Sequence, residues 1–192
     1  MLTTEPSNKP SMKNFWKDVR AIVILPGTAV VFMPSYLWWR FGVDPFGLWR
    51  EHRSWAVVFA VVGVLFVLAG LRMIAATIAM LRAIGNGTVA PWDPTQRLVV
   101  HGIYRHVRNP MISGVFAVIL GEALLTASPA VFLWLVVFVI GKSIYIPLVE
   151  ERSLRRRFGS DYDEYRTAVP RWIPRRTAWQ PSWSGQQRSE IS

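Results

Sequence analysis

The stretch MISGVFAVILGEALLTASPAVFLWLVVFVIGKSIYIPLVEE, residues 111–151, decides the fold of this chain. It contains two apolar runs, residues 111–128 and 130–149, which are separated only by the turn at Ser128-Pro129. Each run approaches the ~20 residues that an α-helix needs to cross the hydrocarbon of a bilayer. The stretch therefore predicts a transmembrane helical hairpin that ends in the paired carboxylates Glu150 and Glu151.

Two further apolar runs precede this hairpin, at residues 21–39 and 55–81. The first contains Pro26, Gly27 and Pro34, which membrane helices tolerate when neighbouring groups satisfy the freed backbone. A signal peptide is the alternative, but the polar lead is long and no small-residue cleavage site follows. Four such runs in 192 residues, 52% of them apolar, leave too little polar chain to cover a soluble core. We expect an all-α integral membrane bundle of about four transmembrane helices.

The basic residues are distributed unevenly along the chain, whose net charge is +10. If the N-terminus is cytoplasmic, 17 Lys and Arg residues lie on the inner side and 3 on the outer side. This asymmetry is what the positive-inside rule requires of a multi-pass protein with both termini in the cytoplasm. The charge therefore reports topology, and we expect no nucleic-acid partner. The chain has no Cys, and His101 and His106 lack the spacing of a metal site.

The chain is predicted to form one domain, residues 1–176, followed by a disordered tail, residues 177–192. A cytoplasmic loop over residues 82–110 joins the second and third helices, and residues 150–168 look helical. The tail is rich in Gln and Ser, a composition that buries little apolar surface.

Small residues recur at intervals of seven on two of the predicted helices. The second helix has Ala56, Gly63 and Gly70, and the third has Gly114 and Gly121. Small residues on one face allow membrane helices to approach closely. We expect these faces to serve helix packing. Inside the third helix, Glu122 either pairs across the bundle, with Lys142 as its best available partner, or is protonated near the outer interface. Pro147 is expected to splay the fourth helix.

The hairpin geometry brings its two carboxylates to the cytoplasmic loop. With straight limbs of equal rise, Glu150 lies level with Val107, and Glu151 lies level with His106. The carboxylates therefore meet the Arg105–Arg108 segment at the inner face of the membrane. Such a cluster suits a small zwitterion; the alternative is an interfacial group of ion pairs that merely anchors the helix ends.

A set of motifs in the C-terminal half extends this pattern. It comprises Gly102-x-Tyr104-Arg105-x-x-Arg108-Asn109-Pro110, Glu150-Glu151, and Phe158-Gly-x-x-Tyr162-x-x-Tyr165-x-x-x-Val169-Pro170. Together, over residues 91–174, these motifs resemble the isoprenylcysteine carboxyl methyltransferase family, and phospholipid N-methyltransferases share much of the pattern. The resemblance implies S-adenosylmethionine as methyl donor, bound at the cytoplasmic face. The cofactor contacts that it implies are Gln96, Arg97, Leu98, Val99, Tyr104, Asn109, Pro110, Met111, Ile112 and Glu150.

Two further residues are predicted to act on the acceptor. Arg108 is a cation that could place a carboxylate, and Glu151 is a carboxylate that could take the proton of an amine. The chain departs from the resembled pattern at Ile112, where a Tyr is usual. It departs again at Ile146, where prenylcysteine enzymes carry an Arg for the substrate carboxylate.

The sequence therefore predicts a membrane methyltransferase whose lipophilic acceptor enters from the bilayer. Both O-methylation of a carboxylate and N-methylation of an amine remain open, as does the oligomeric state. A sterol-reductase-like enzyme that uses NADPH is the alternative enzyme, although the chain has no glycine-rich phosphate loop. A membrane accessory protein without activity is the non-enzymatic alternative.

Overall fold

The computed structural model describes residues 23–42, 53–84, 98 and 100–182, and these residues are helical or irregular, without strands. The first helical segment is η1 (Val23–Phe32), a π-helix that continues into α2 (Met33–Phe41). The other elements are α4 (Arg53–Ile84), the 3₁₀ turn η2 (Gly102–Arg105), α5 (Pro110–Thr126), α6 (Pro129–Tyr145), the π-helical η3 (Ile146–Glu150) and α7 (Glu151–Ala168). The all-α prediction is confirmed for this part of the chain.

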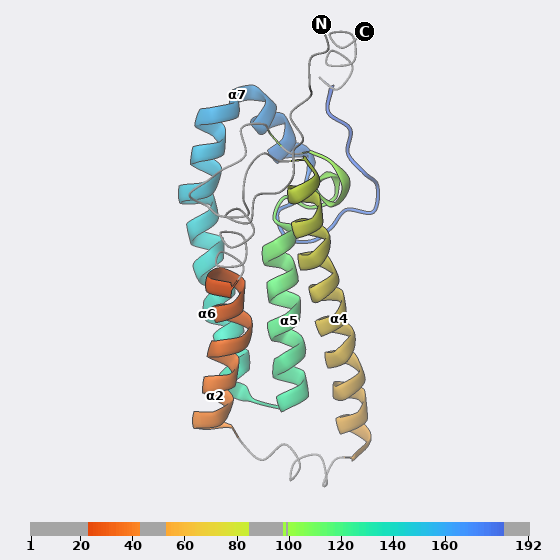
Figure 1. Cartoon of the computed structure of the whole chain (residues 1–192), viewed down its shortest axis with the longest axis vertical. Helices are drawn as coiled ribbons and strands as arrows, with labels where there is room; N and C mark the ends of the chain where they lie inside the picture. The colour runs from red at the N-terminus through yellow and green to blue at the C-terminus, as the bar shows by residue number, and fades with distance from the viewer. Residues whose placement is uncertain (1–22, 43–52, 85–97, 99, 183–192) are drawn as a thin grey trace, which may run out of the picture.

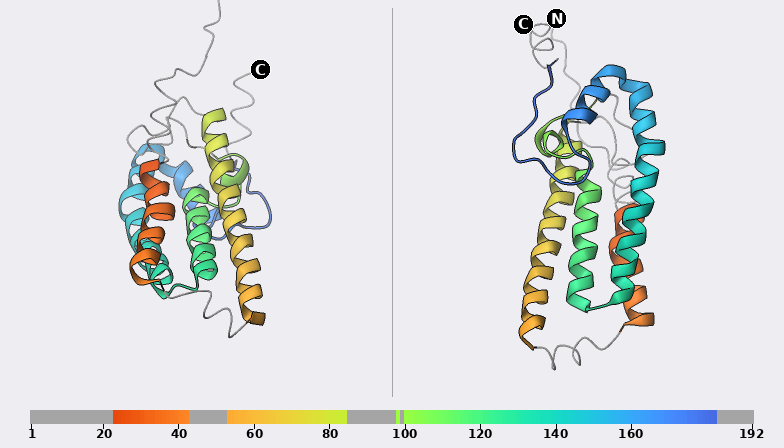
Figure 2. Two further views of the ribbon diagram at one scale, coloured as in Figure 1. Left: turned by 60° about the horizontal axis from the view of Figure 1, so that its bottom comes forward. Right: turned by 180° about the vertical axis from the view of Figure 1, so that it is seen from behind.

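The four long helical segments run alternately up and down along one axis (Figure 1). The helices α5 and α6 form the predicted hairpin, whose turn lies at the end of the molecule farthest from α7 (Figure 2). Ala127 closes α5 in the left-handed conformation, and the Ser128 hydroxyl accepts the Val131 N–H at the start of α6. Pro129 occupies the first helical turn, where its missing N–H costs nothing.

The small residues of α4 and α5 face one another, as predicted. A Cβ atom added to Gly70 would lie 2.5 Å from the Gly114 carbonyl oxygen, and one added to Gly121 would lie 2.5 Å from the Gly63 carbonyl oxygen. Ala56 and Thr77 continue the Gly63–Gly70 face at the same spacing, and both are buried. The two backbones therefore touch along their length, which gives dispersion contacts that lipid cannot replace.

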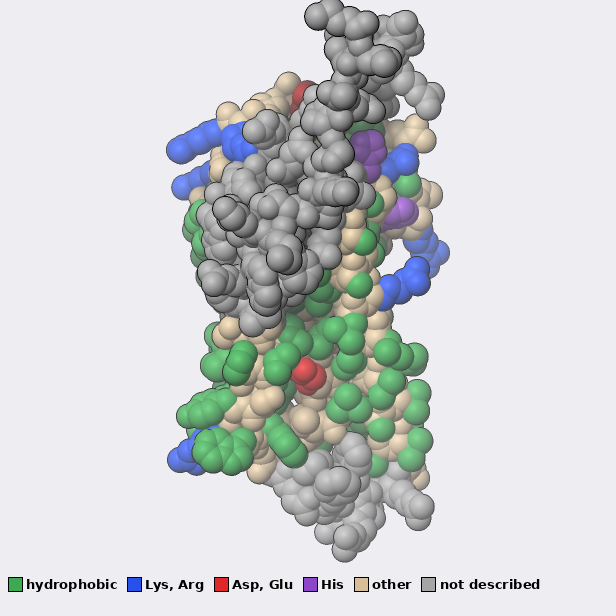
Figure 3. Space-filling model, viewed as in Figure 1, with side chains coloured by type: hydrophobic (Ala, Val, Ile, Leu, Met, Phe, Trp, Pro, Cys, Tyr) green, Lys and Arg blue, Asp and Glu red, His purple; other side chains and the backbone are tan. Residues whose placement is uncertain are grey.

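Most of the apolar surface of α4 and α6 is exposed. The segments Ser54–Met80 and Pro129–Ala168 are long and apolar enough to cross a membrane, and α5 is a shorter apolar helix. Only 11% and 17% of the two long apolar windows are buried, whereas the core helix of a soluble protein is mostly buried. Figure 3 shows hydrophobic side chains over the helices, with most visible Lys and Arg nearer α7. This is the surface of a multi-pass membrane protein.

The second long segment, at 40 residues, is twice the length that a bilayer requires. Its apolar part ends at Val149, and α7 beyond it is polar. Residues 150–168 are helical as predicted, but the backbone breaks at Gly159, where φ is 54° and ψ is −128°. Because this conformation suits only glycine, the chain reverses there and returns toward the bundle (Figure 2).

The predicted pairing of Glu122 with Lys142 is wrong. The Glu122 Oε2 atom is buried and has no hydrogen-bond partner among the described residues. The Lys142 ammonium instead lies 5.8 Å from the Phe138 ring centroid and 5.3 Å from that of Tyr145. Among the described residues, Lys142 therefore does not pair with Glu122, and the Glu122 Oε2 atom has no hydrogen-bond partner.

The C-terminal end of the described chain makes contacts beyond residue 176, where the predicted domain ends. Residues 170–182, which we call the C-terminal strap, leave α7 and cross the outside of the loop that precedes α5. The Trp179 N–H donates to the Arg105 carbonyl oxygen at 3.0 Å, and the Ser182 hydroxyl bonds Glu164 at 2.7 Å. Contacts therefore continue through Ser182, and residues 183–192 lie outside the described residues.

Candidate functional site

The loop that carries the Tyr-Arg-x-x-Arg-Asn-Pro motif is fixed at its start by glycine. Gly102 has φ of +52°, and a Cβ atom there would collide with the Met80 side chain of α4. The chain then forms η2 and reaches Pro110, the first residue of α5. We call residues 100–109 the motif loop. Its position is set by α4 at one end and by α5 at the other.

The C-terminal strap holds the motif loop through backbone hydrogen bonds. The Arg108 and Asn109 N–H groups donate to the Pro170 and Arg171 carbonyl oxygens at 2.9 and 3.3 Å. Farther along, the Arg175 N–H donates to the His106 carbonyl oxygen at 2.9 Å. These bonds join segments more than sixty residues apart in sequence. The loop therefore keeps its shape only while the strap is in place.

Glu151 is the charged centre of this region, and only 4% of its side chain is exposed. Its Oε1 accepts from Arg108 Nη1 and from Arg171 Nε, each at 2.8 Å. Its Oε2 accepts from Arg171 Nη2 at 3.1 Å and lies 3.7 Å from Arg166 Nε. Arg108 also donates through Nε to the Val169 carbonyl oxygen at 2.8 Å. One buried carboxylate thus links the motif loop, α7 and the strap.

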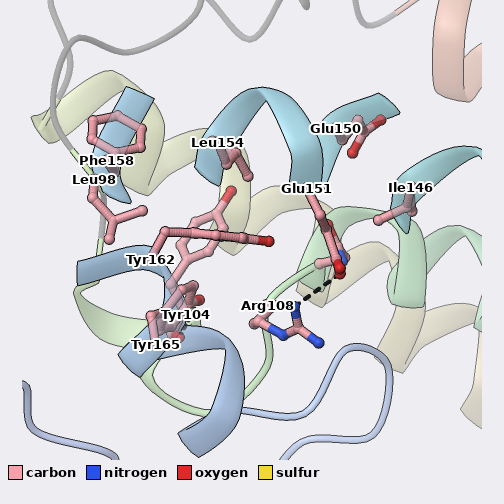
Figure 4. Close-up of a pocket in the computed structure, with 11 residues that line it drawn as sticks. Leu98, Tyr104, Arg108, Ile146, Glu150, Glu151, Leu154, Phe158, Tyr162 and Tyr165 are labelled. Atoms are coloured by element: carbon pink, nitrogen blue, oxygen red, sulfur yellow. Dashed lines mark hydrogen bonds and ion pairs between the residues drawn. The ribbon is translucent and has the colours of Figure 1, made fainter. Parts of the chain in front are cut away.

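A cavity of about 120 Å³ lies beside this ion-pair cluster, between the motif loop and α7. Figure 4 shows Glu151 directed toward Arg108, whereas Glu150 points away from that pair. Glu150 makes no ion pair within the described part of the chain, and burial raises its pKa above the ordinary value. Lys142 opposes this pKa shift, and Glu151 adds to it. A half-buried carboxylate that makes no direct ion pair is suited to bind a cation.

Aromatic side chains form the other walls of the cavity. Tyr104 comes from the motif loop, and Phe158, Tyr162 and Tyr165 come from both arms of α7 (Figure 4). The Tyr165 hydroxyl donates to the Tyr104 carbonyl oxygen at 2.7 Å. Burial raises the pKa of Tyr104 to about 12 and also raises the pKa values of Tyr162 and Tyr165. All three hydroxyls therefore stay protonated at neutral pH, and the rings offer neutral π-faces.

The structure brings together half of the residues that the sequence predicts for this site. The cavity is lined by Leu98, Tyr104, Arg108, Asn109, Glu150 and Glu151. Pro110, Met111 and Ile112 form the first turn of α5 and do not line it. Gln96, Arg97 and Val99 lie outside the described residues. The predicted meeting of the carboxylates with the Arg105–Arg108 segment is confirmed by the Arg108–Glu151 ion pair.

Several lining residues are missing from the predicted set. They are Ile146, Leu154, Phe158, Tyr162 and Tyr165. Positions 154, 158, 162 and 165 follow a helical interval of three or four, so their shared face was readable from sequence. The fold-back at Gly159, which brings the far end of that face over the cavity, carries no comparable signal.

Comparison with known families agrees with this geometry. The family model described as phospholipid methyltransferase matches residues 56–161, which is more than half of the chain. The match spans α4, α5, α6 and the first arm of α7, and so includes both carboxylates and Arg108. A comparison with curated proteins gave no match. On the family match, this chain belongs to the phospholipid methyltransferase family.

Proposed function

We propose that this protein is an S-adenosylmethionine-dependent methyltransferase that acts on a membrane lipid. The observation that carries the proposal is the cavity, which Glu150 lines together with aromatic side chains at the end of two apolar helices. A water-soluble donor reaches such a site from the aqueous side, and a lipid reaches it from the bilayer. Membership of the phospholipid methyltransferase family supports both the donor and the lipid character of the acceptor.

The chemistry of the lining residues fits the donor. Glu150 supplies the anion that the ammonium group of the amino acid end requires. Asn109, at the positive end of α5, suits the carboxylate, and we keep Pro110, Met111 and Ile112 as proposed neighbours of that group. Tyr104 and Phe158 offer faces to the sulfonium and adenine. Leu98 lines the same cavity, and we keep Gln96, Arg97 and Val99 as proposed neighbours of the adenosine.

Methyl transfer from a sulfonium is an in-line displacement, which depends on alignment and exclusion of water. The bound donor supplies an electrophilic methyl group and leaves as a neutral thioether. Within the protein, Glu151 is bound by two guanidinium groups, so we assign it a positioning role rather than that of a general base. Arg108 is likewise held by Glu151 and Val169. Together they fix the wall against which the acceptor is aligned.

The proposed donor site can be tested by Glu150→Gln, with Asp163→Asn on α7 as the matched control. Glu150→Gln removes the proposed counter-ion of the ammonium, so the affinity for S-adenosylhomocysteine should fall by about 1.5–3 kcal/mol in calorimetry. Asp163→Asn, which changes a half-exposed carboxylate outside the cavity, should leave the affinity unchanged. Unchanged affinity of the Glu150 variant would remove that residue from the site.

The wild-type protein separates the competing functions. S-adenosylhomocysteine should bind and NADPH should not, and tritium from the methyl donor should appear in a lipid extract. Binding of NADPH alone would support the reductase alternative. Donor binding without transfer to any lipid fraction would support an accessory role.

We further propose four membrane spans with both termini in the cytoplasm, η1 and α2 forming the first span. The distribution of basic residues supports this orientation. Because the chain has no Cys, a single Cys can be introduced at Ser182 as a probe. An impermeant thiol reagent should label it only after the cells are opened, and labelling in intact cells would reverse the topology.

A further inference from the structure

The cations near the cavity divide into two groups. The first group consists of three arginines that form ion pairs with Glu151 at 2.8 to 3.7 Å, namely Arg108, Arg166 and Arg171. Lys142 makes no ion pair within 4.0 Å among the described residues, and Glu150 is the carboxyl on which its charge acts. Its ammonium lies near the rings of Phe138 and Tyr145. A cation within an apolar membrane segment that no ion pair neutralises is costly, so an anionic ligand beside it would be favourable.

Lys142 lies on the face of its helix that leads to the cavity. Ile146 follows it by four residues, is 1% exposed and lines the cavity; Glu150 follows by four more and lines it as well. Intervals of four place the three side chains on one helical face. Lys142 is also the cation whose charge acts on the Glu150 carboxyl.

Aromatic contacts turn this face toward α5 rather than toward bulk lipid. Phe138, one turn before Lys142, packs edge-on against Phe116 of α5 with centroids 5.9 Å apart. Phe116 in turn contacts Trp172 of the C-terminal strap at 5.1 Å. The ammonium is thus held beside the α5–α6 hairpin, on the bilayer side of the cavity.

The spacing of the two charges suits a lipid headgroup. Eight residues separate Lys142 from Glu150, which corresponds to roughly 12 Å along the helix. The flexible four-carbon stem of lysine lets the ammonium cover part of that distance. A lipid that presents its reacting group at the level of Glu150 places its phosphate deeper, toward Lys142.

We propose that Lys142 binds the phosphate of the acceptor lipid and so selects phosphate-bearing lipids as methyl acceptors. The inference rests on the proposed function, because it names the acceptor group for the same cavity. It assigns the membrane side of the site to Lys142 and the donor side to Glu150. The ion-paired Arg108 then shapes the wall between them.

The first test measures lipid binding in detergent, with dihexanoyl-phosphatidylethanolamine compared with dihexanoylglycerol, which lacks the phosphate. Wild-type protein should bind the phospholipid more tightly, and Lys142→Gln should reduce that preference at least tenfold. Lys142→Arg should retain it. Arg72→Gln changes an exposed cation in the apolar segment of α4 and should also retain it. A preference that survives in Lys142→Gln would overturn the proposal.

The second test asks whether the lipid bound at Lys142 is the methyl acceptor, and it also checks that the donor site is intact. Lys142→Gln should still bind S-adenosylhomocysteine, which shows that its donor site is folded. The lipid measurements are made with this donor analogue saturating, because loss of Lys142 also removes a charge that favours the ionised Glu150. The KM for the phospholipid should rise about tenfold with little change in kcat. Weaker lipid binding with an unchanged KM would show that Lys142 holds a bystander lipid, and would overturn its role in acceptor selection. Wild-type protein that fails to bind S-adenosylhomocysteine refutes the proposed function, whereas the binding comparison still decides whether Lys142 recognises phosphate.

Discussion

The contact between α4 and α5 and the clamp between the motif loop and the C-terminal strap hold the same protein together by different means. In the first, glycine carbonyls of one helix touch the backbone of the other, and no side-chain hydrogen bond joins the two helices among the side chains that the structure describes. In the second, a buried carboxylate and a series of long-range backbone bonds join three segments. A small apolar cluster accompanies these bonds and consists of Val100, Tyr162, Tyr165 and Val169.

The difference follows from the solvent that each region meets. Lipid tails are as apolar as leucine, so helices within a bilayer gain nothing from burying apolar surface and depend on close backbone contact. At the aqueous end, where the motif loop and the strap lie, burial of apolar side chains is favourable, and charged hydrogen bonds fix the geometry of the contacts. The site lies in the aqueous region and is anchored on the rigid membrane region. Substitutions on the two sides should therefore fail in different ways.

Loss of the Glu151 charge should have the largest effect on stability, and the effect should be confined to the contacts between the motif loop, α7 and the strap. Glu151→Gln leaves Arg108 and Arg171 without their shared anion, and breaking a buried ion pair costs about 3 kcal/mol or more. Tryptic cleavage after Arg175 and Arg176 should then accelerate roughly 100-fold, if cleavage follows opening of the strap. Asp163→Asn, in an exposed ion pair with Arg155, should change the cleavage rate little. Equal rates in both variants would contradict the clamp.

The next largest effect is expected at the helix contact. Gly70→Ala places a methyl group 2.5 Å from the Gly114 carbonyl oxygen, so the helices must move apart, at about 2 kcal/mol. Gly141→Ala on α6 meets no atom within 4 Å and should stabilise its helix by about 0.5–1 kcal/mol. Thermal unfolding in detergent should show opposite shifts. A similar shift in both would show that α4 and α5 are not in close contact.

The fold-back of α7 should respond to a smaller change in backbone freedom. Gly159→Ala adds a methyl group that meets nothing within 4 Å, so its cost of about 1–3 kcal/mol comes from the backbone conformation alone. Amide hydrogen exchange of residues 160–168 should speed up, while exchange in α4 stays unchanged. The neighbouring exposed Ser160→Ala should leave both unchanged. Unaltered exchange in the glycine variant would mean that the reversal needs no glycine.

Glu122 should give the smallest effect, with the opposite sign. Its buried Oε2 has no partner, and Glu122→Gln replaces an ionisable group in the bundle by a neutral amide. We expect a stabilisation of less than about 1 kcal/mol by thermal unfolding in nanodiscs. Marked destabilisation would show that the carboxyl group has a partner among residues that the structure does not describe.

The hairpin and the helix contact could be predicted because they depend on short-range regularities. A run of about twenty apolar residues, a Ser-Pro turn and glycines at intervals of seven each specify local geometry. The meeting of Arg108 with Glu151 then follows from equal rise on the two limbs. These are the features of the fold that the sequence predicts correctly.

The clamp could not be predicted in the same way. Its bonds between residues 105–109 and 170–179 use backbone groups, which leave no mark on composition or periodicity. The Gln- and Ser-containing end suggested disorder, although Trp179 packs against Tyr165 with centroids 5.7 Å apart. The charges of Glu151 and Arg108 were recognised from the sequence. Only the structure shows that the two groups form an ion pair with each other, which makes them positioning residues rather than groups that act on the acceptor.

The π-helical turn η3 has a consequence for the angular phase of the two adjacent carboxylates. Neighbouring residues on a helix differ by about 100° around its axis, so Glu150 and Glu151 necessarily look in different directions. A π-helical turn contains one residue more than an α-helical turn, and it shifts the phase of everything that follows. Deleting a single residue such as Leu148 would shift each following residue back by one position. Glu151 would then take the direction that Glu150 now has, and Arg152 would face Arg108 and Arg171 in place of the carboxylate. The extra residue in the π-helical turn therefore sets the direction of both side chains, so that Glu150 lines the cavity while Glu151 pairs with arginines.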